Sequence, residues 1–141
     1  MNLLTYIDLN SLFQASMVAQ ILVAAFLAVL FLQSGIDKVV DWKGNLSWLT
    51  GHFKDSPLSN MVPLMLGTIT IFEIAAGLLS AIGAVMLLLG KGSELALYGA
   101  QLSALSILML FFGQRLAKDY AGAATLVSYF ILSIIGILIL G

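Results

Sequence analysis

Residues 61–89 read MVPLMLGTITIFEIAAGLLSAIGAVMLLL, and Glu73 is the single charged residue in that stretch. A helix needs about 20 apolar residues to cross roughly 30 Å of hydrocarbon, so this stretch is long enough to span a membrane. Three other stretches lack charged residues and are long enough: 9–36, 95–114 and 120–141. The sequence therefore predicts an all-α integral membrane protein with four transmembrane helices.

The composition agrees with a membrane protein and excludes several other classes. Hydrophobic residues make up 61% of the 141-residue chain and charged residues 9%, whereas soluble domains are about half apolar and about a quarter charged. Six basic residues and a net charge of −1 cannot form a phosphate-binding surface, so we expect no nucleic-acid partner. The chain has no cysteine, which excludes disulfides, a thiolate nucleophile and cysteine-ligated metals.

The spans fit a single domain over 1–141, arranged as an antiparallel four-helix bundle. A tight turn, GKGSE, joins the second span to the third. The first residues of the chain carry no basic region followed by a cleavage site, so we expect the first span to be retained and not cleaved as a signal peptide. The expected spans are approximately 16–38, 61–89, 95–113 and 123–141.

The first loop contains NLSWLTGHF, residues 45–53. Leu46, Leu49 and Phe53 recur there at helical spacing, and Trp48 lies beside them. This pattern predicts a short amphipathic helix over 45–53 that lies in the membrane interface, with the tryptophan at headgroup depth. Asn45 is the expected N-cap of that helix.

The basic residues predict how the bundle is oriented. Five of them fall in or beside the first and third loops, and one falls in the second loop. Because cytoplasmic loops are enriched in Lys and Arg, we expect the first and third loops in the cytoplasm and both termini outside. The first and third loops contain or adjoin Lys38, Lys43, Lys54, Arg115 and Lys118, whereas the second loop contains Lys91.

Glu73 is the strongest candidate for a functional side chain, because seventeen uncharged residues flank it on either side. An ionised group at that depth costs at least about 2.5–3.5 kcal/mol. Small residues share its helical face, so another helix can approach closely and Glu73 should point into the bundle. These are Ala76, Gly77, Ser80, Ala81 and Ala84. Two interpretations stay open: a proton-binding or ion-paired group lining a small cavity, or a protonated group that holds two helices together.

A polar pocket around Glu73 is predicted from the ends of spans one and three. Gln33, Ser34, Asp37, Lys38 and Asp41 fall within an arc of roughly 140° on span one. Gln33 and Ser34 are deep enough to favour an inward hydrogen-bonding role, whereas Lys38 either faces inward or snorkels to the interface. Arg115 lies at the matching end of span three. We expect the pocket to be formed by Gln33, Asp37, Lys38, Glu73 and Arg115.

Residues of the fourth span and the first loop add weaker candidates. One arc of span four holds Tyr129 among small residues, which favours packing, with hydrogen bonding to a pocket ligand as the alternative role of Tyr129. His52 is the only histidine, so no multi-histidine metal site is predicted. We expect it on the surface of a loop or, alternatively, against a quinone headgroup. The small or polar residues of the span-four arc are Thr125, Ser128, Ser133 and Gly136. No role is assigned to Gln101, Ser103 and Ser106, which we expect not to share a face.

Residues 31–42, FLQSGIDKVVDW, resemble the DoxX family of small bacterial and archaeal membrane proteins. The shared features are a Gly followed closely by a Lys at the end of an apolar helix, and a Glu followed by glycines in the next span, here FEIAAGLLSAIG. The resemblance implies a four-helix membrane bundle in the bacterial cytoplasmic membrane. It also implies a subunit of a redox assembly, as in a thiosulfate:quinone oxidoreductase or a complex linked to thiol and superoxide defence.

Three functions are weighed for such a chain. The favoured one is a membrane subunit of a larger complex, surrounded by lipid and other subunits, that contacts a quinone but does not catalyse by itself and carries no covalent cofactor. The second is a small proton-coupled transporter that acts as a homo-oligomer, with Glu73 as the coupling carboxylate. The third is a structural anchor.

Overall fold

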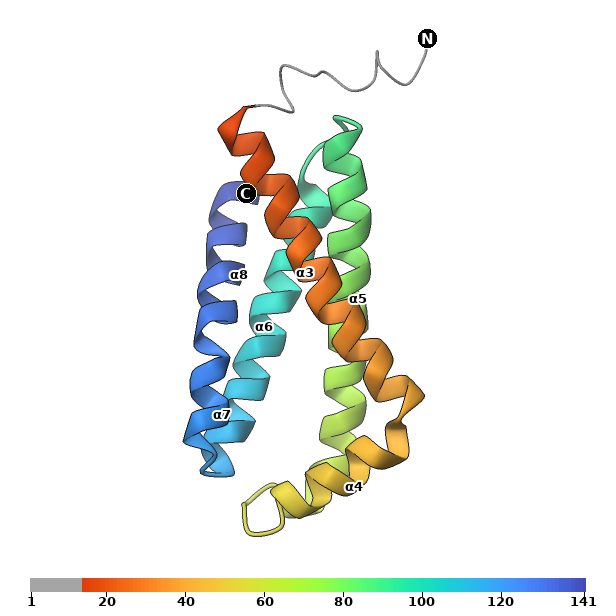
Figure 1. Ribbon diagram of the computed structural model, residues 1–141, viewed down its shortest axis with the longest axis vertical. Coiled ribbons are helices and arrows are strands. Elements are labelled where there is room, and N and C mark those ends of the chain that lie inside the picture. The colour runs from red at the N-terminus through yellow and green to blue at the C-terminus, as the bar shows by residue number, and fades with distance from the viewer. Residues whose placement is uncertain (1–13) are drawn as a thin grey trace.

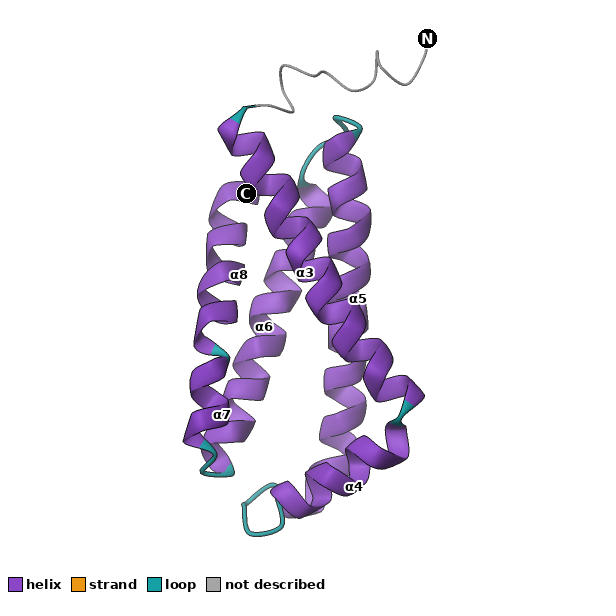
Figure 2. Cartoon of the chain, in the orientation of Figure 1, coloured by secondary structure: helices purple, strands orange, loops and turns teal. Residues whose placement is uncertain are grey.

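The computed structural model describes residues 14–141, so the prediction of an uncleaved N-terminus falls on residues outside that range. The described residues form helices joined by short loops, without a β-strand (Figure 2). Four segments are long and apolar enough to cross a membrane: α3, η1 with α5, α6, and α7 with α8. The chain is therefore an all-α, multi-pass membrane protein, as predicted. The elements are α3 (Ala15–Val40), α4 (Trp42–His52), η1 (Ser59–Met61), α5 (Val62–Leu88), α6 (Glu94–Leu116), α7 (Tyr120–Thr125) and α8 (Val127–Leu140).

The four spans form a ring in which α3 packs on α5, α5 on α6, α6 on α8, and α8 on α3 (Figure 1). Glycines make these approaches close. A Cβ added to Gly77 of α5 would lie 2.8 Å from the backbone nitrogen of Leu32 in α3, and one added to Gly83 would collide with Ala96 of α6. Because only glycine leaves room for the neighbouring backbone at these points, the small-residue face predicted beside Glu73 is the packing face of α5.

Helix α4 lies obliquely across one end of the bundle (Figure 1). It begins at Trp42, three residues before the predicted start, because Asp41 caps it by accepting a hydrogen bond from the Gly44 backbone nitrogen at 3.3 Å. The prediction of Asn45 as N-cap is wrong, since the Asn45 amide donates to the Asp41 backbone oxygen at 2.8 Å. Trp48 is exposed and Phe53, just past the helix, is buried.

The third loop, which joins the third and fourth spans, is shorter than predicted. Helix α6 continues to Leu116 and α7 begins at Tyr120, so the connection is only three residues long. Asp119 accepts a hydrogen bond from the Gly122 backbone nitrogen at 2.9 Å and so caps α7. Lys118 takes a left-handed conformation, with φ of 61°, which turns the chain sharply enough for this connection.

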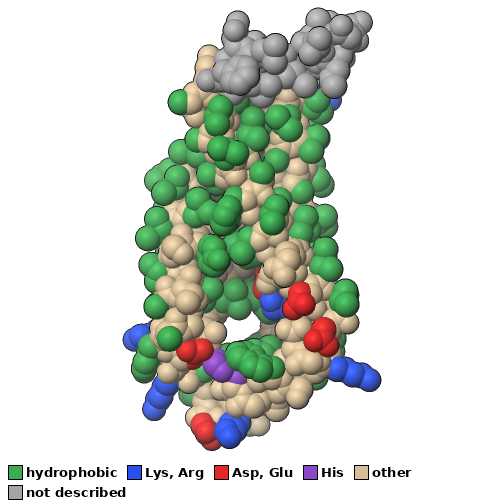
Figure 3. All heavy atoms as spheres, in the orientation of Figure 1, with side chains coloured by type: hydrophobic (Ala, Val, Ile, Leu, Met, Phe, Trp, Pro, Cys, Tyr) green, Lys and Arg blue, Asp and Glu red, His purple; other side chains and the backbone are tan. Residues whose placement is uncertain are grey.

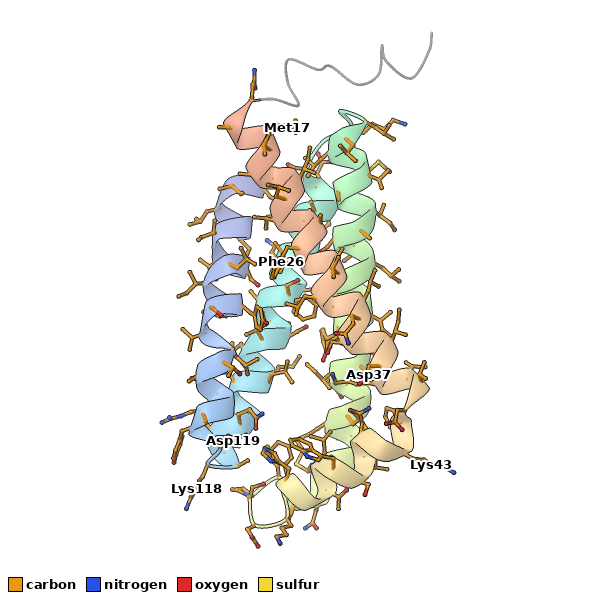
Figure 4. The ribbon with its side chains drawn as sticks, viewed as in Figure 1. Met17, Phe26, Asp37, Lys43, Lys118 and Asp119 are labelled. Atoms are coloured by element: carbon orange, nitrogen blue, oxygen red, sulfur yellow. The ribbon has the colours of Figure 1, made fainter. Side chains whose placement is uncertain are left out.

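Charged side chains gather at the end of the bundle that α4 and the α6–α7 turn form (Figure 3). Lys43 and Lys118 both lie at this end (Figure 4). Lys91 belongs to the α5–α6 turn at the opposite end. The asymmetry of basic residues seen in the sequence is therefore an asymmetry between the two ends of the folded bundle.

Candidate functional site

An ion pair between α3 and α5 lies inside the bundle. The Lys38 Nζ is 3.0 Å from the Glu73 Oε1, and the Glu73 side chain is 1% exposed. The Lys38 side chain is 16% exposed, and its ammonium also donates to the Oγ of Ser34 at 2.8 Å and to the Ser34 backbone oxygen at 3.5 Å. Lys38 therefore faces inward, and the two predicted residues Lys38 and Glu73 come together.

The close contact of α3 with α5 places the pair. A Cβ added to Gly35 would lie 2.7 Å from the Cγ1 of Ile74, and Gly77 meets Leu32 one turn further along. Glu73 and Lys38 flank this contact, since each lies within four residues of one of the two glycines. Glu73 is the twelfth residue of the 27-residue α5, so at 1.5 Å per residue it lies near the middle of the span.

Neither carboxylate oxygen of Glu73 accepts a well-aligned hydrogen bond from the described residues, although both are buried. The Lys38 ammonium, at 3.0 Å, is the ion-pair partner of Oε1. A buried carboxylate normally accepts several hydrogen bonds. Glu73 thus keeps acceptor capacity that a proton or the donor group of a ligand can use.

An opening passes through the bundle between α3 and the α6–α7 turn, with α4 along its lower edge (Figure 3). A basic side chain borders the opening (Figure 3). Asp37 and Asp119 lie on opposite sides of the opening (Figure 4). Lys38 is 16% exposed and Glu73 is 1% exposed, so the ion pair is accessible from its Lys38 side.

A separate apolar pocket of about 160 Å³ lies between α6 and the α7–α8 helix. Its lining has no exposed polar surface, and it belongs to the half of α6 nearer the α6–α7 turn. Ligand sites combine mostly apolar walls with a few placed polar groups. This half of the bundle contains both kinds of surface. The lining residues are Ile107, Leu108, Phe111, Leu126, Val127 and Phe130.

The remaining predicted site residues are not brought to Glu73. Gln33 and Asp37 are exposed, which contradicts the inward role predicted for Gln33. Gln33 lies on the side of α3 opposite to its buried residues, because α5 and α8 approach α3 from the other side. Arg115 is exposed and stacks on Tyr120, with its guanidinium carbon 4.5 Å from the ring centroid. Arg115 therefore covers the surface end of α7 and does not line the pocket.

Tyr129 of α8 is half-buried and packs near Phe26 of α3, with ring centroids 6.4 Å apart. This contact fits the packing role predicted for its arc, and Ser133 and Gly136 of the same arc are buried. In α6, Ser103 and Ser106 are both buried whereas Gln101 is exposed, so the three residues do not share one face, as expected. The two serine hydroxyls donate to backbone oxygens one turn earlier in the same helix, so they fill space without exposing a polar group.

His52 joins α4 to the α6–α7 turn, and the sequence alone did not indicate this contact. Its Nε2 is 2.7 Å from the Gln114 Oε1 and 3.6 Å from the Asp119 Oδ2, and its ring stacks on Trp48 with centroids 4.5 Å apart. His52 is therefore a half-buried contact residue, and the prediction of a surface loop is wrong. The only sequence signal was the placement of polar Gln114 and Asp119 at the end of the third span.

Comparison of the chain with protein-family models, with curated proteins and with solved structures found no match. Within residues 14–141 no group of three or more His, Asp or Glu side chains is arranged to hold a metal ion. The ion pair itself can provide hydrogen bonding, charge compensation and the holding of a proton.

Proposed function

We propose that this chain is a membrane subunit that binds a lipid-soluble ligand of the quinone class beside the Lys38–Glu73 pair. The observation that carries the proposal is a buried ion pair near the middle of the membrane span, next to an opening through the bundle. Ionisable residues at such depth are rare and mark ligand or proton pathways. The apolar pocket between α6 and the α7–α8 helix, separate from the ion pair but in the same half of the bundle, suits the apolar tail of such a ligand.

The two charged groups suit the two needs of a quinone site. The Lys38 ammonium can donate a hydrogen bond to a carbonyl oxygen, and the Glu73 carboxylate can hold a proton within reach of the same head. The chain supplies no redox centre of its own, because it has no cysteine and a single histidine. Electrons would therefore come from another subunit, and this also fits the resemblance to DoxX proteins in residues 31–42.

The orientation proposed is with the α4 end in the cytoplasm of a bacterial cell. Lys38 no longer counts as a topological charge, because it is paired within the bundle. Four basic residues remain at the α4 end against one at the other, which still favours this orientation. The α4 end has Lys43, Lys54, Arg115 and Lys118, and the other end has Lys91.

Binding of a short-chain, photoreactive quinone to the purified chain in lipid nanodiscs tests the function. We expect saturable labelling that an unlabelled quinone displaces, with the dissociation constant raised about tenfold or more in Lys38→Met, because a charge-assisted hydrogen bond contributes about 1.5–3 kcal/mol. Lys43→Met is the matched control, since it removes the same charge from an exposed position of α4. Labelling that does not saturate, or that Lys38→Met leaves unchanged, contradicts the proposal.

A proton-coupled carrier is the second candidate, and the free acceptor capacity of the buried Glu73 favours it. A carrier requires transport by the purified chain alone in liposomes, abolished by Glu73→Gln. A structural anchor predicts neither transport nor saturable quinone binding, with Glu73→Gln affecting stability alone.

A further inference from the structure

The Lys38 side chain turns back into the bundle and does not reach for the membrane interface. Helix α3 ends at Val40, two residues after Lys38, so a snorkelling side chain would carry its ammonium toward that end. The ammonium instead contacts Ser34, one turn earlier in the helix, at 2.8 Å from the Oγ and 3.5 Å from the backbone oxygen. Ser34 therefore holds the ammonium on the membrane side of Lys38.

Contacts between α3 and α5 show that this depth is the depth of Glu73. Gly35 is next to Ile74, and Leu32 is next to Gly77, so Glu73 is level with residue 36. That level lies midway along the helical turn between Ser34 and Lys38. The ammonium is thus held between a hydroxyl of its own helix and, at 3.0 Å, the carboxylate of α5.

The hydroxyl of Ser34 has an unused hydrogen. It accepts a hydrogen bond from Lys38, and a serine hydroxyl has one O–H donor besides its acceptor lone pairs. That hydrogen reaches no acceptor among residues 14–141, whereas the hydroxyl of Thr70 donates to a backbone oxygen of its own helix. Ser80 also lacks a partner, but it is fully buried against Gly99. Ser34 is only half-buried, so a molecule that reaches the Lys38 ammonium can also reach this hydroxyl.

We propose that Ser34 is a second ligand-binding residue of the quinone-class site, where it donates its hydroxyl hydrogen to the same carbonyl oxygen that accepts from Lys38. The inference rests on the function proposed above. A carbonyl oxygen has two lone pairs, and two donor atoms 2.8 Å apart can converge on it. The Lys38 ammonium also polarises the Ser34 O–H bond, because hydrogen bonds in a chain strengthen one another.

The arrangement gives the three polar groups different tasks. Glu73 is 1% exposed and Lys38 is 16% exposed, so the carboxylate compensates the charge of the ammonium from its buried side. The accessible side presents the ammonium and the Ser34 hydroxyl, which are both donors. A ligand with a ring carbonyl oxygen therefore matches this side of the site.

Binding of the photoreactive quinone to variants in nanodiscs tests the contact. Ser34→Ala should raise the dissociation constant about three- to tenfold, because one hydrogen bond is lost. Ser34→Thr keeps a hydroxyl and should restore most of the affinity. Ser128→Ala, which removes an exposed hydroxyl from α8, is the matched control. In the Lys38→Met background, Ser34→Ala should raise the dissociation constant by a further factor of about two or more, because Ser34 also donates directly.

A second measurement follows the position of the ammonium without any ligand. Acylation of Lys38 by a water-soluble reagent is quantified by mass spectrometry relative to Lys43, which is exposed on α4. Ser34→Ala should raise the labelling of Lys38 several-fold, because the side chain is then free to extend toward the interface. Ser34→Thr should leave the labelling close to that of the unmodified chain.

The outcomes separate the role of Ser34 from the function on which it rests. A dissociation constant that rises in Lys38→Met but not in Ser34→Ala would overturn the role of Ser34 and leave the proposed function standing. An effect of Ser34→Ala that disappears in the Lys38→Met background would overturn the direct contact with the ligand. Labelling of Lys38 that Ser34→Ala leaves unchanged would overturn the positioning of the ammonium. Absence of saturable binding in every protein, the unmodified chain included, would overturn the proposed function and the ligand contact together.

Discussion

Replacement of Lys38 by methionine tests how much the buried ion pair stabilises the bundle. Methionine keeps most of the aliphatic stem and removes the ammonium, so Glu73 stays buried without a counter-charge. Glu73 is 1% exposed, and the ammonium lies 3.0 Å from it. Breaking a buried pair costs about 3–5 kcal/mol. Lys38 is partly exposed, and the carboxylate can take up a proton, so we expect a loss near the lower end, about 3 kcal/mol.

Reversible unfolding in mixed detergent micelles, by titration with SDS and detection by circular dichroism, measures this loss. The double variant Lys38→Met with Glu73→Gln should recover most of the stability, because a neutral pair no longer leaves a buried charge. Lys43→Met, on the exposed side of α4, should change the free energy of unfolding by less than about 0.5 kcal/mol. A Lys38→Met protein as stable as the unmodified chain would refute the reasoning, and so would a double variant no more stable than the single one.

Two further predictions concern packing. Gly77→Val places atoms where a Cβ alone would lie 2.8 Å from the α3 backbone, so we expect a loss of about 1–3 kcal/mol in the same titration; unchanged stability would contradict the close contact of α3 with α5. His52→Ala removes the contact with Gln114 that ties α4 to α6. Trypsin should then cut after Lys54 several-fold faster, because the loop opens more often. Asn45→Ala, which loses a hydrogen bond only to the N-terminal end of α4, is the control, and equal cleavage rates in both variants would contradict the role of His52.

The sequence by itself determined the fold class and the inward direction of Glu73. Charge-free stretches of membrane length are a local property, since a backbone in hydrocarbon must satisfy its own hydrogen bonds and does so as a helix. Glu73 shares a helical face with Gly77 and Ser80, and both are buried. Exposing a carboxylate to lipid costs free energy, and the small residues beside Glu73 leave room for a neighbouring helix. Both effects favour a Glu73 side chain that points into the bundle. Lys38 and Arg115 were the two basic residues that the sequence placed within reach of that carboxylate, and the sequence did not choose between them.

Only the tertiary structure decided which face of each helix points inward and which side chains of different helices meet at the end of the bundle. Gln33 and Lys38 belong to the same polar arc, yet α5 contacts α3 at Gly35 and leaves Gln33 outside. His52 meets Gln114 because α4 crosses the end of the bundle. Helical periodicity states which residues share a face, but the direction of that face depends on where the neighbouring helices pack. Those positions arise from contacts between residues far apart in the chain, and a pattern within one segment does not contain them.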